Sequence, residues 1–333
     1  MNILLFGGTG FLGREIAIAA LHAGHKVTCL ARGNGEIPQG ATFIRADRNH
    51  PHALEKVSDT SWDAVIELTS HPRFIHDAAA TLNASHWVYV SSSSTYARFD
   101  TPEPDEQTSV WPPFNGDMLE NQADYGPAKV ACEDIVRRHT DNHTIIRPGL
   151  IGGFGDTTSR STYYPWRFAH PSGTQVAIPD PTFPLSLVDA RDLATWIIHC
   201  IETPITGTFN IAGETATVAD VVKHSIALSD SKAVPFIIDD VTLAAAHVSP
   251  WMGPHSMPLW TGGDPAWRYI ATLNSQKARQ HGFTSRPLQE TLAAALEYQI
   301  QSGAPTGAGL TDAEERALIQ YANEQSTNDG AAG

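Results

Sequence analysis

The sequence contains little cysteine and no metal-binding pattern, and these shortages exclude two kinds of scaffold. Its 333 residues include only Cys29, Cys132 and Cys200, which are widely spaced and form no CxxC pair. We therefore expect neither a disulfide framework nor a zinc site, and the chain suits a reducing compartment. Fifteen histidines are present, but none stands in HExxH or another ligand spacing, so we expect no metal.

Positive charge and long apolar runs are also scarce. The chain has 22 Lys and Arg residues against 36 Asp and Glu residues, a formal net charge of −14. A surface this acidic repels phosphate backbones, so nucleic acid is not an expected partner. No run reaches the roughly 18 apolar residues of a membrane helix. The apolar start at 1–6 lacks the basic region of a signal peptide. We expect a cytoplasmic protein without membrane partners.

Short apolar runs alternate regularly with helical patterns over the first 150 residues. The runs predict strands at 3–6, 26–30, 42–44, 64–68, 87–90 and 144–146, and helical spacing predicts helices at 11–23, 74–82 and 129–138. Strands buried on both faces and separated by helices are typical of a parallel sheet. The pattern therefore predicts an α/β protein with a doubly wound parallel sheet, the Rossmann fold.

The alternation stops near residue 150, which predicts a second unit. Glycine, proline and aromatic residues crowd the next stretch, and one more strand is expected at 208–211. The predicted division is a dinucleotide-binding domain at 1–150 with 185–212 returning to it, a smaller mixed substrate lobe from 151–184 and 213–322, and a flexible tail at 323–333. Thr311 and Glu314 have capping-box spacing, so a last helix is expected to start there.

A GxxGxxG turn follows the first strand and opens the first helix. Gly7 permits the sharp turn, Gly10 lets the backbone approach a pyrophosphate, and Gly13 lets the helix pack closely. The helix N-terminus then offers free N–H groups and a positive dipole end to the phosphates. The expected cofactor contacts in this turn are Gly7, Thr9, Gly10, Phe11, Leu12 and Gly13.

The end of the second strand distinguishes the two nicotinamide dinucleotides. A carboxylate there binds the ribose 2′-hydroxyl of NAD, whereas an arginine accommodates the 2′-phosphate of NADP. Arg32 stands at about this place, and no acidic residue occurs before Glu36. The sequence therefore favours NADP, with NAD as the alternative.

Two segments supply hydroxyl groups, and one of them also carries a cation. Tyr125 and Lys129 form a YxxxK pair, which shares one face of a helix. An ordinary phenol ionises near pH ~10, and a nearby ammonium lowers that pKa toward the working range of an acid/base catalyst. The strand at 87–90 ends in Ser91–Ser94, where a hydroxyl can bond a reacting oxygen beyond the carboxyl end of the sheet.

In the order of these motifs the chain resembles the extended or atypical short-chain dehydrogenase/reductase superfamily, the NAD-dependent epimerase/dehydratase-like group. The resemblance extends over nearly the whole chain. It implies Tyr125 as acid/base and Lys129 as its pKa tuner and ribose anchor. It implies Ser92, four residues before Tyr96, as the substrate-hydroxyl partner, with Ser93 as the alternative.

The resemblance also implies further cofactor contacts and an assembly. Asp47 resembles the acid that meets the adenine, Leu68 and Thr69 resemble the loop beside the cofactor, and Pro148 lies in a segment that resembles the one near the nicotinamide. Members of this superfamily often dimerise through helices that flank YxxxK, so a homodimer is one expected state.

Three reactions occur among related enzymes: reduction or oxidation, epimerisation through a transient ketone, and sugar dehydration. The dehydratases carry an Asp-Glu pair where this chain has Ser93 and Ser94, so dehydration ranks last. An NADP-type selector favours a reductase of a small carbonyl or hydroxyl substrate, and an NAD-dependent sugar epimerase is the alternative. Candidate cations for a sugar-nucleotide diphosphate are Arg160, Arg167 and Arg268.

A protein of another class, a dinucleotide-binding sensor or an RNA-binding protein with little catalysis, is the second alternative. The intact pair of Tyr125 and Lys129 argues against a sensor that has lost its chemistry, and the acidic charge argues against RNA binding. If Tyr125 and a serine hydroxyl converge at one pocket, the enzyme interpretation is favoured.

Overall fold

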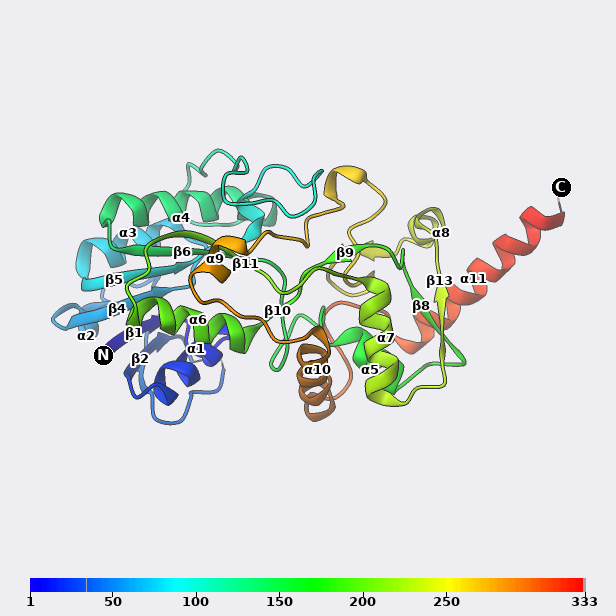
Figure 1. Cartoon of the computed structure of the whole chain (residues 1–333), viewed down its shortest axis with the longest axis horizontal. Helices are drawn as coiled ribbons and strands as arrows, with labels where there is room; N and C mark the ends of the chain where they lie inside the picture. Colours follow the sequence, from blue (N-terminus) through cyan, green and yellow to red (C-terminus); the bar gives the residue numbers. More distant parts are fainter. Residues whose placement is uncertain (34, 332–333) are drawn as a thin grey trace.

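A seven-stranded parallel sheet organises the first half of the chain. The structure, a computed structural model, describes residues 1–33 and 35–331. The sheet has the order β11-β6-β5-β4-β1-β2-β3 (Figure 1). Its strands are β1 (Asn2–Phe6), β2 (Lys26–Ala31), β3 (Thr42–Arg45), β4 (Ser61–Glu67), β5 (Asn83–Val90), β6 (His143–Pro148) and β11 (Gly207–Ile211). The predicted α/β class with a doubly wound parallel sheet is confirmed.

The strand order reverses beside β1. The chain moves outward from β1 through β2 to β3, then returns to β4, which pairs with the other side of β1 through Ile3 and Ala64. Open parallel sheets bind ligands at such a reversal, beyond the carboxyl ends of the strands. The late strand β11 extends the sheet by pairing in parallel with β6, where Thr208 lies opposite Ile145.

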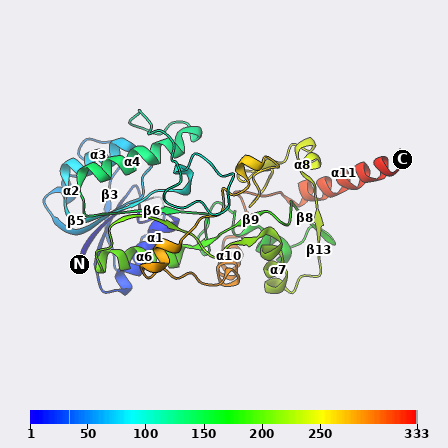
Figure 2. The ribbon, with the colours of Figure 1, turned by 45° about the horizontal axis from the view of Figure 1, so that its top comes forward.

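Alternation of side chains along β1 supplies both faces of the sheet. Ile3 and Leu5 pack in one core with helices α1 (Phe11–His22) and α6 (Ala190–Glu202). Leu4 and Phe6 pack in a second core. That core includes α3 (Pro72–Thr81) and α4 (Tyr125–His139). Figures 1 and 2 show these two helix pairs on opposite sides of the sheet. Because both faces are covered, every residue of β1 except Asn2 is buried.

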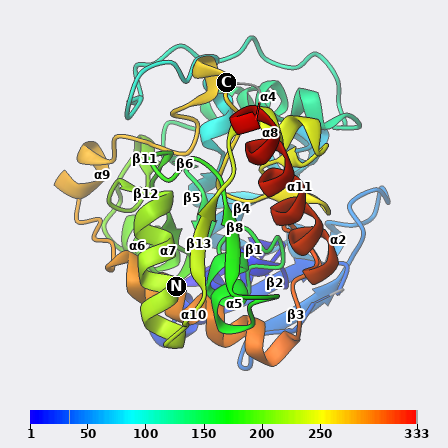
Figure 3. The same ribbon diagram turned by 90° about the vertical axis from the view of Figure 1, so that its right-hand side faces the viewer.

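A separate hydrophobic core forms the second unit, at the right of Figure 1. It joins α5 (Tyr163–Ala169), α7 (Val218–Ser229) and α10 (Leu288–Ser302) to a two-stranded parallel sheet of β8 (Gln175–Ile178) and β13 (Val234–Ile237) (Figure 3). The shorter elements are α2 (Glu55–Ser58), β7 (Ile151–Gly152), β9 (Pro184–Leu185), β10 (Val188–Asp189), β12 (Ala216–Thr217), α8 (Asp240–Ala245), β14 (Ser249–Pro250), β15 (Ser256–Met257) and α9 (Gln276–Gln280).

Two parts of the C-terminal region differ from expectation. Ala278 and Phe283, which the expected division assigns to the lobe, pack in the α1/α6 core of the sheet half. The expected flexible tail at 323–333 is largely helical, because α11 (Asp312–Ala331) runs through most of it, and 332–333 lie outside the described residues. The helix starts where the capping spacing predicts, with Glu314 accepting the N–H of Thr311 at 2.7 Å. Once nucleated, a helix adds one hydrogen bond per residue, which carries it through a polar sequence.

Candidate active site

The glycine turn between β1 and α1 is shaped by close backbone contacts. Gly7 adopts a φ of +84°, which side chains rarely tolerate. A Cβ atom on Gly13 would lie 2.2 Å from the carbonyl oxygen of Gly7, so only glycine lets the helix approach the turn this closely. Gly10 precedes α1 and no side chain caps the helix, so its first N–H groups face the cavity beyond β1. Such N–H groups can bind a phosphate.

A cavity of about 600 Å³ lies beside this turn, at the carboxyl ends of β1 to β4. Most of the expected cofactor contacts line it: Gly7, Thr9, Gly10, Phe11, Arg32, Asp47, Leu68 and Thr69. They come from four separate strand ends, as the reversal of strand order at β1 and β4 requires. The cavity is therefore the place where a dinucleotide's adenosine half would lie.

Arg32 and Asp47 differ in how far they are committed to other groups. Arg32 is exposed on the rim of the cavity just after β2. Asp47 follows β3 and accepts hydrogen bonds from the backbone N–H and the side-chain amide of Asn49, both at 3.0 Å. The backbone hydrogen bond from Asn49 lowers the pKa of Asp47, and the charge of Arg32 lowers it further. Asp47 thus stays ionised at the end of β3, next to the end of β2 that carries Arg32.

Sequence reasoning missed a buried ion pair beneath this cavity. The guanidinium of Arg48 lies between the rings of Phe6, at 4.2 Å, and Phe74, at 4.8 Å, and it pairs with the buried Glu67. Glu67 also accepts the N–H groups of Leu68 and Thr69, at 3.0 and 3.1 Å. The pair therefore shapes the loop that follows β4. The signal in the sequence is a carboxylate at the end of the apolar run 64–68.

A second cavity of about 590 Å³ lies on the other side of the glycine turn. It shares Gly7, Gly10, Phe11 and Leu68 with the first, so the two adjoin across the turn. The remaining expected site residues line it: Leu12, Gly13, Ser92, Ser93, Tyr125, Lys129 and Pro148. Tyr125 and the serine hydroxyls thus border one space, the arrangement that favours an enzyme over a sensor.

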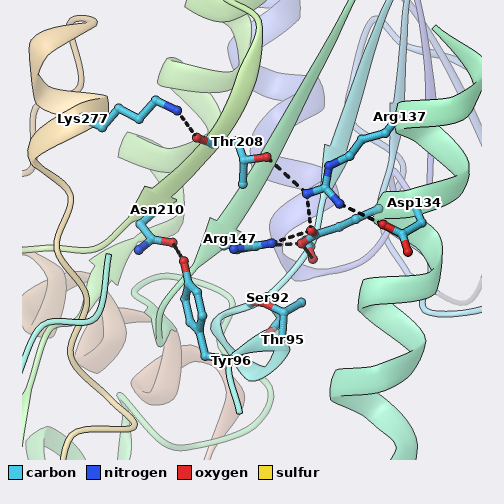
Figure 4. Close-up of polar contacts among 11 residues, drawn as sticks. Ser92, Thr95, Tyr96, Asp134, Arg137, Arg147, Thr208, Asn210 and Lys277 are labelled. Carbon is cyan, nitrogen blue, oxygen red and sulfur yellow. Dashed lines mark hydrogen bonds and ion pairs between the residues drawn. The ribbon is translucent and has the colours of Figure 1, made fainter. Parts of the chain in front are cut away.

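The structure sets Ser91 apart from the other serines of the run 91–94. Ser91 is buried and its hydroxyl donates to Glu133 at 2.6 Å. Glu133 also binds Arg147 through two hydrogen bonds of 2.9 and 2.7 Å, and Arg137 at 2.7 Å. Figure 4 shows the two arginines reaching this carboxylate from β6 and α4. Ser91 therefore belongs to a buried network and is not available to a substrate.

All four serines of the run 91–94 line the cavity, and Ser92 and Ser93 are the two expected to meet a substrate. Ser92 has an extended backbone, and its Oγ accepts the N–H of Ser94 at 3.1 Å, which caps a 3-10 turn over Ser93–Thr95. This use leaves the hydroxyl proton of Ser92 for another acceptor. Both serines line the cavity, so Ser93 stays the alternative partner for a substrate hydroxyl.

Lys129 is buried close to the ring of Tyr125. Tyr125 is the first residue of α4, and the Nζ of Lys129 lies 5.9 Å from the centre of its ring. Lys129 is 2% exposed, and its Nζ donates to the carbonyl oxygens of Leu68 (3.3 Å), Thr69 (3.0 Å) and Val90 (2.8 Å). Three acceptors satisfy all the protons of an ammonium group. Lys129 therefore ties α4 to the ends of β4 and β5 and contributes its charge to the cavity.

Comparison with known proteins places this geometry in a family. A model of the NAD dependent epimerase/dehydratase family matches residues 3–212. The chain belongs to this family. It is accordingly an enzyme that depends on a nicotinamide dinucleotide, and the matched segment carries the glycine turn, the serines and the pair of Tyr125 and Lys129.

Individual relatives are more distant. Photosystem II assembly factor Ycf39 of Trieres chinensis is 30% identical over 120 residues, which cover 31% of this chain and only 38% of that protein. UDP-N-acetylglucosamine 4-epimerase from Bacillus cereus superposes with a TM-score of 0.64 at 20% identity, over 90% of this chain and 99% of that one. UDP-glucose 4-epimerase from Bifidobacterium longum, solved with NAD+ and UDP, gives 0.65 at 15% identity, over 90% and 98%. At these identities the two epimerases share the fold of this family member.

Other kinds of site are not seen in the described residues. Within 1–33 and 35–331, no three His, Cys, Asp or Glu side chains are grouped to hold a metal ion. The three cysteines are buried and unpaired, and burial raises the pKa of Cys29 to about 11, which leaves it a protonated thiol. Over the same residues, no helix has the length and apolar character needed to cross a membrane.

Proposed function

We propose that this family member is an NADP-dependent oxidoreductase of the short-chain dehydrogenase/reductase type, acting on a carbonyl or hydroxyl group of a small molecule. The observation that carries the proposal is one 590 Å³ cavity that Tyr125, Ser92 and the glycine turn all line. A substrate carbonyl bound in this cavity would lie beside the Tyr125 phenol, which can carry its proton, and beside the glycine turn that would hold the dinucleotide. When bound, the nicotinamide ring would supply or accept the hydride.

The side chains of this cavity fit the proton half of that reaction. In the direction of reduction, the Tyr125 hydroxyl donates its proton to the carbonyl oxygen as the carbonyl carbon gains hydride, and water later reprotonates the phenolate. The buried charge of Lys129, 5.9 Å from the ring, stabilises that phenolate. Ser92, or Ser93 beside it, donates a hydrogen bond that holds the substrate oxygen against the phenol.

The selection of NADP rests on the first cavity. Arg32 is exposed there without an ion pair among the described residues, and it stands where a 2′-phosphate needs a cation. The nearest acid, Asp47, is occupied by Asn49. An arginine presents several donors to a phosphate and gains charge-assisted hydrogen bonds that a ribose hydroxyl cannot match.

Calorimetric titration with NADPH and NADH tests the cofactor. We expect NADPH to bind more tightly, and Arg32→Ala to weaken NADPH by about 10-fold or more while NADH changes little, since one charge-assisted contact is removed. Equal loss for both dinucleotides would remove Arg32 as the selector. Binding of neither would leave the turn without a ligand.

Loss of NADPH absorbance during incubation with a panel of aldehydes and ketones tests the reaction. For any substrate found, Tyr125→Phe is expected to lower kcat by about 10²–10⁴-fold, the usual contribution of a positioned acid. Dinucleotide affinity should stay within about twofold, because the phenol contacts no phosphate. Full turnover by Tyr125→Phe would contradict the role given to this residue.

A second candidate is an NAD-dependent sugar epimerase. It is favoured by the similarity to sugar epimerases, one of which was solved with NAD+. An epimerase must retain its cofactor through both half-reactions. Protein purified with NAD that is released only on unfolding would therefore support the epimerase, whereas freely exchanging NADPH supports the reductase.

A further inference from the structure

The loop that connects β7 to α5 forms the lobe side of the second cavity, which Tyr125 also lines. Asp156 is buried and fixes the loop through four hydrogen bonds, from the N–H and hydroxyl of Thr158 (2.9 and 2.6 Å) and of Ser161 (2.9 and 2.7 Å). Gly155 lies so near the glycine turn that a Cβ atom there would be 3.2 Å from the ring of Phe11. The loop therefore lies over the turn and holds Arg160 at the cavity.

Arg160 is held in place but its charge is not neutralised. Its Nε donates to the hydroxyl of Thr158 at 3.1 Å, and its guanidinium carbon lies 5.4 Å from the centre of the Trp251 ring. Within residues 1–33 and 35–331, no ion pair and no hydrogen bond occupies its terminal nitrogens. Arg160 is partly exposed; burial lowers its pKa, and the charge of Asp156 opposes that shift. Asp156 is committed to its own loop.

The other two arginines that were candidates for binding a diphosphate are already paired with carboxylates. Only Lys129 and Arg160 are cations among the described residues that line the cavity. Three carbonyl oxygens accept the protons of Lys129, which leaves Arg160 as the cation with free donors. Arg167 binds Asp312, and Arg268 binds Asp180 at 3.0 Å. Of the three arginines considered for a sugar-nucleotide diphosphate, one is therefore free.

We propose that Arg160 binds one anionic group of the substrate, a carboxylate or a phosphate, with the Trp251 ring beside it. The inference rests on the proposed function, because it places the anion in the same cavity as Tyr125. It narrows the substrate to a small carbonyl or hydroxyl compound with a single terminal anionic group. Nucleotide sugars are disfavoured, because they present two phosphate groups and the cavity offers one arginine with free donors to bind them.

Equilibrium binding tests Arg160 without any turnover. The full-length protein saturated with NADP+ is titrated with inorganic phosphate and, separately, with malonate, and the heat of binding is recorded. We expect at least one of these anions to bind, and Arg160→Gln to weaken it about 10- to 100-fold, the usual worth of a charge-assisted hydrogen bond. Arg160→Lys should retain part of the affinity. Binding of phosphate alone, or of malonate alone, assigns the source of the anion.

The matched control is Arg268→Gln, which removes an arginine that is paired outside the cavity lining. It should leave anion binding unchanged. Unchanged anion affinity in Arg160→Gln, or no anion binding by the parent protein, overturns the inference. So does a loss of NADP+ affinity in Arg160→Gln as large as the loss for the anion, because the arginine would then serve the cofactor's pyrophosphate.

Kinetics separates this inference from the proposed reaction. With a 2-oxo acid and its methyl ester, or an aldose phosphate and the free aldose, the charged compound of the accepted pair should have the lower KM. Arg160→Gln should remove that preference by raising the KM of the charged compound toward that of the neutral one. Anion binding without turnover of any carbonyl compound would refute the reaction and leave Arg160's site standing. Turnover with no preference for the charged compound would support the reaction and refute the role proposed for Arg160.

Discussion

The sheet half and the lobe supply opposite walls of one cavity, and they hold their residues in different ways. In the sheet half, the serines and Tyr125 lie at the ends of elements that are locked by close packing at Gly13 and by the buried Glu133–Arg147 pair. In the lobe, Arg160 is carried by a loop that one carboxylate, Asp156, holds through hydrogen bonds. Changes to the first wall should therefore cost stability, and changes to the second should chiefly cost substrate binding.

The largest stability loss is expected from Glu133→Gln. This substitution keeps the shape of the side chain but leaves Arg147 buried without a counter-charge, and breaking a buried pair in this way costs about 3–5 kcal/mol. Denaturant unfolding followed by circular dichroism measures the change. Arg98→Gln is the control, because its pair with Asp100 is exposed and should contribute little. Equal losses in the two variants would contradict the buried network.

The same variant predicts a pH effect. Burial by itself would raise the pKa of Glu133, but the hydrogen bonds and charge of Arg147 outweigh it, and the pKa is lowered from the ordinary value of 4.5. A lowered pKa in the folded state stabilises the protein above 4.5, and this stabilisation is lost as the pH falls through the folded value. As the pH falls below 5, the free energy of unfolding should therefore fall less in Glu133→Gln than in the parent protein. A difference in stability between the two proteins that does not change with pH would contradict this prediction.

A smaller loss is expected from Gly13→Ala. The added Cβ would lie 2.2 Å from the Gly7 oxygen, so the helix must move, which costs about 1–3 kcal/mol. Gly10→Ala is the comparison, because its nearest neighbour would be at 3.5 Å and its φ of −86° suits alanine. It should keep its stability and lose dinucleotide affinity. If both variants behave alike, the two glycines do not have the separate roles assigned to them.

The smallest stability change is expected in the lobe, for Asp156→Asn. The amide nitrogen replaces one of two accepting oxygens, and the net loss should be about 1–2 kcal/mol. The same change loosens the loop that carries Arg160. The loss of binding free energy for the phosphate or malonate probe should therefore exceed the loss of unfolding free energy. Anion affinity equal to that of the parent protein would show that the loop is held by other contacts.

Much of the sheet half could be predicted from the sequence because its signals are local. The buried strand at 3–6, the glycines after it and the YxxxK pair at Tyr125 each lie within a few residues, and periodicity and backbone geometry act over that range. The strand at 208–211 was also visible, although its place beside β6 was not. Even the last helix started where its capping spacing indicated, at Thr311.

The assignment of individual side chains needed distant contacts. Four consecutive serines are equivalent in the sequence, and Ser91 is set apart only because Glu133, 42 residues away, accepts its hydroxyl. The family resemblance implies a role for Lys129 at the ribose, but it does not show that the carbonyl groups of Leu68, Thr69 and Val90 accept its protons. Pairing of this kind follows from which strand ends meet, and no local pattern records it.

The sequence by itself determined the fold class, the place of the glycine turn and the residue types at the catalytic cavity, because periodicity, glycine geometry and helix spacing are properties of neighbouring residues. The tertiary structure alone decided which charges are spent. Arg147, Arg167 and Arg268 each meet a carboxylate, while Arg160 faces the cavity beside Trp251. An arginine has the same charge in any sequence, and only packing decides whether a partner neutralises it or leaves it for a ligand.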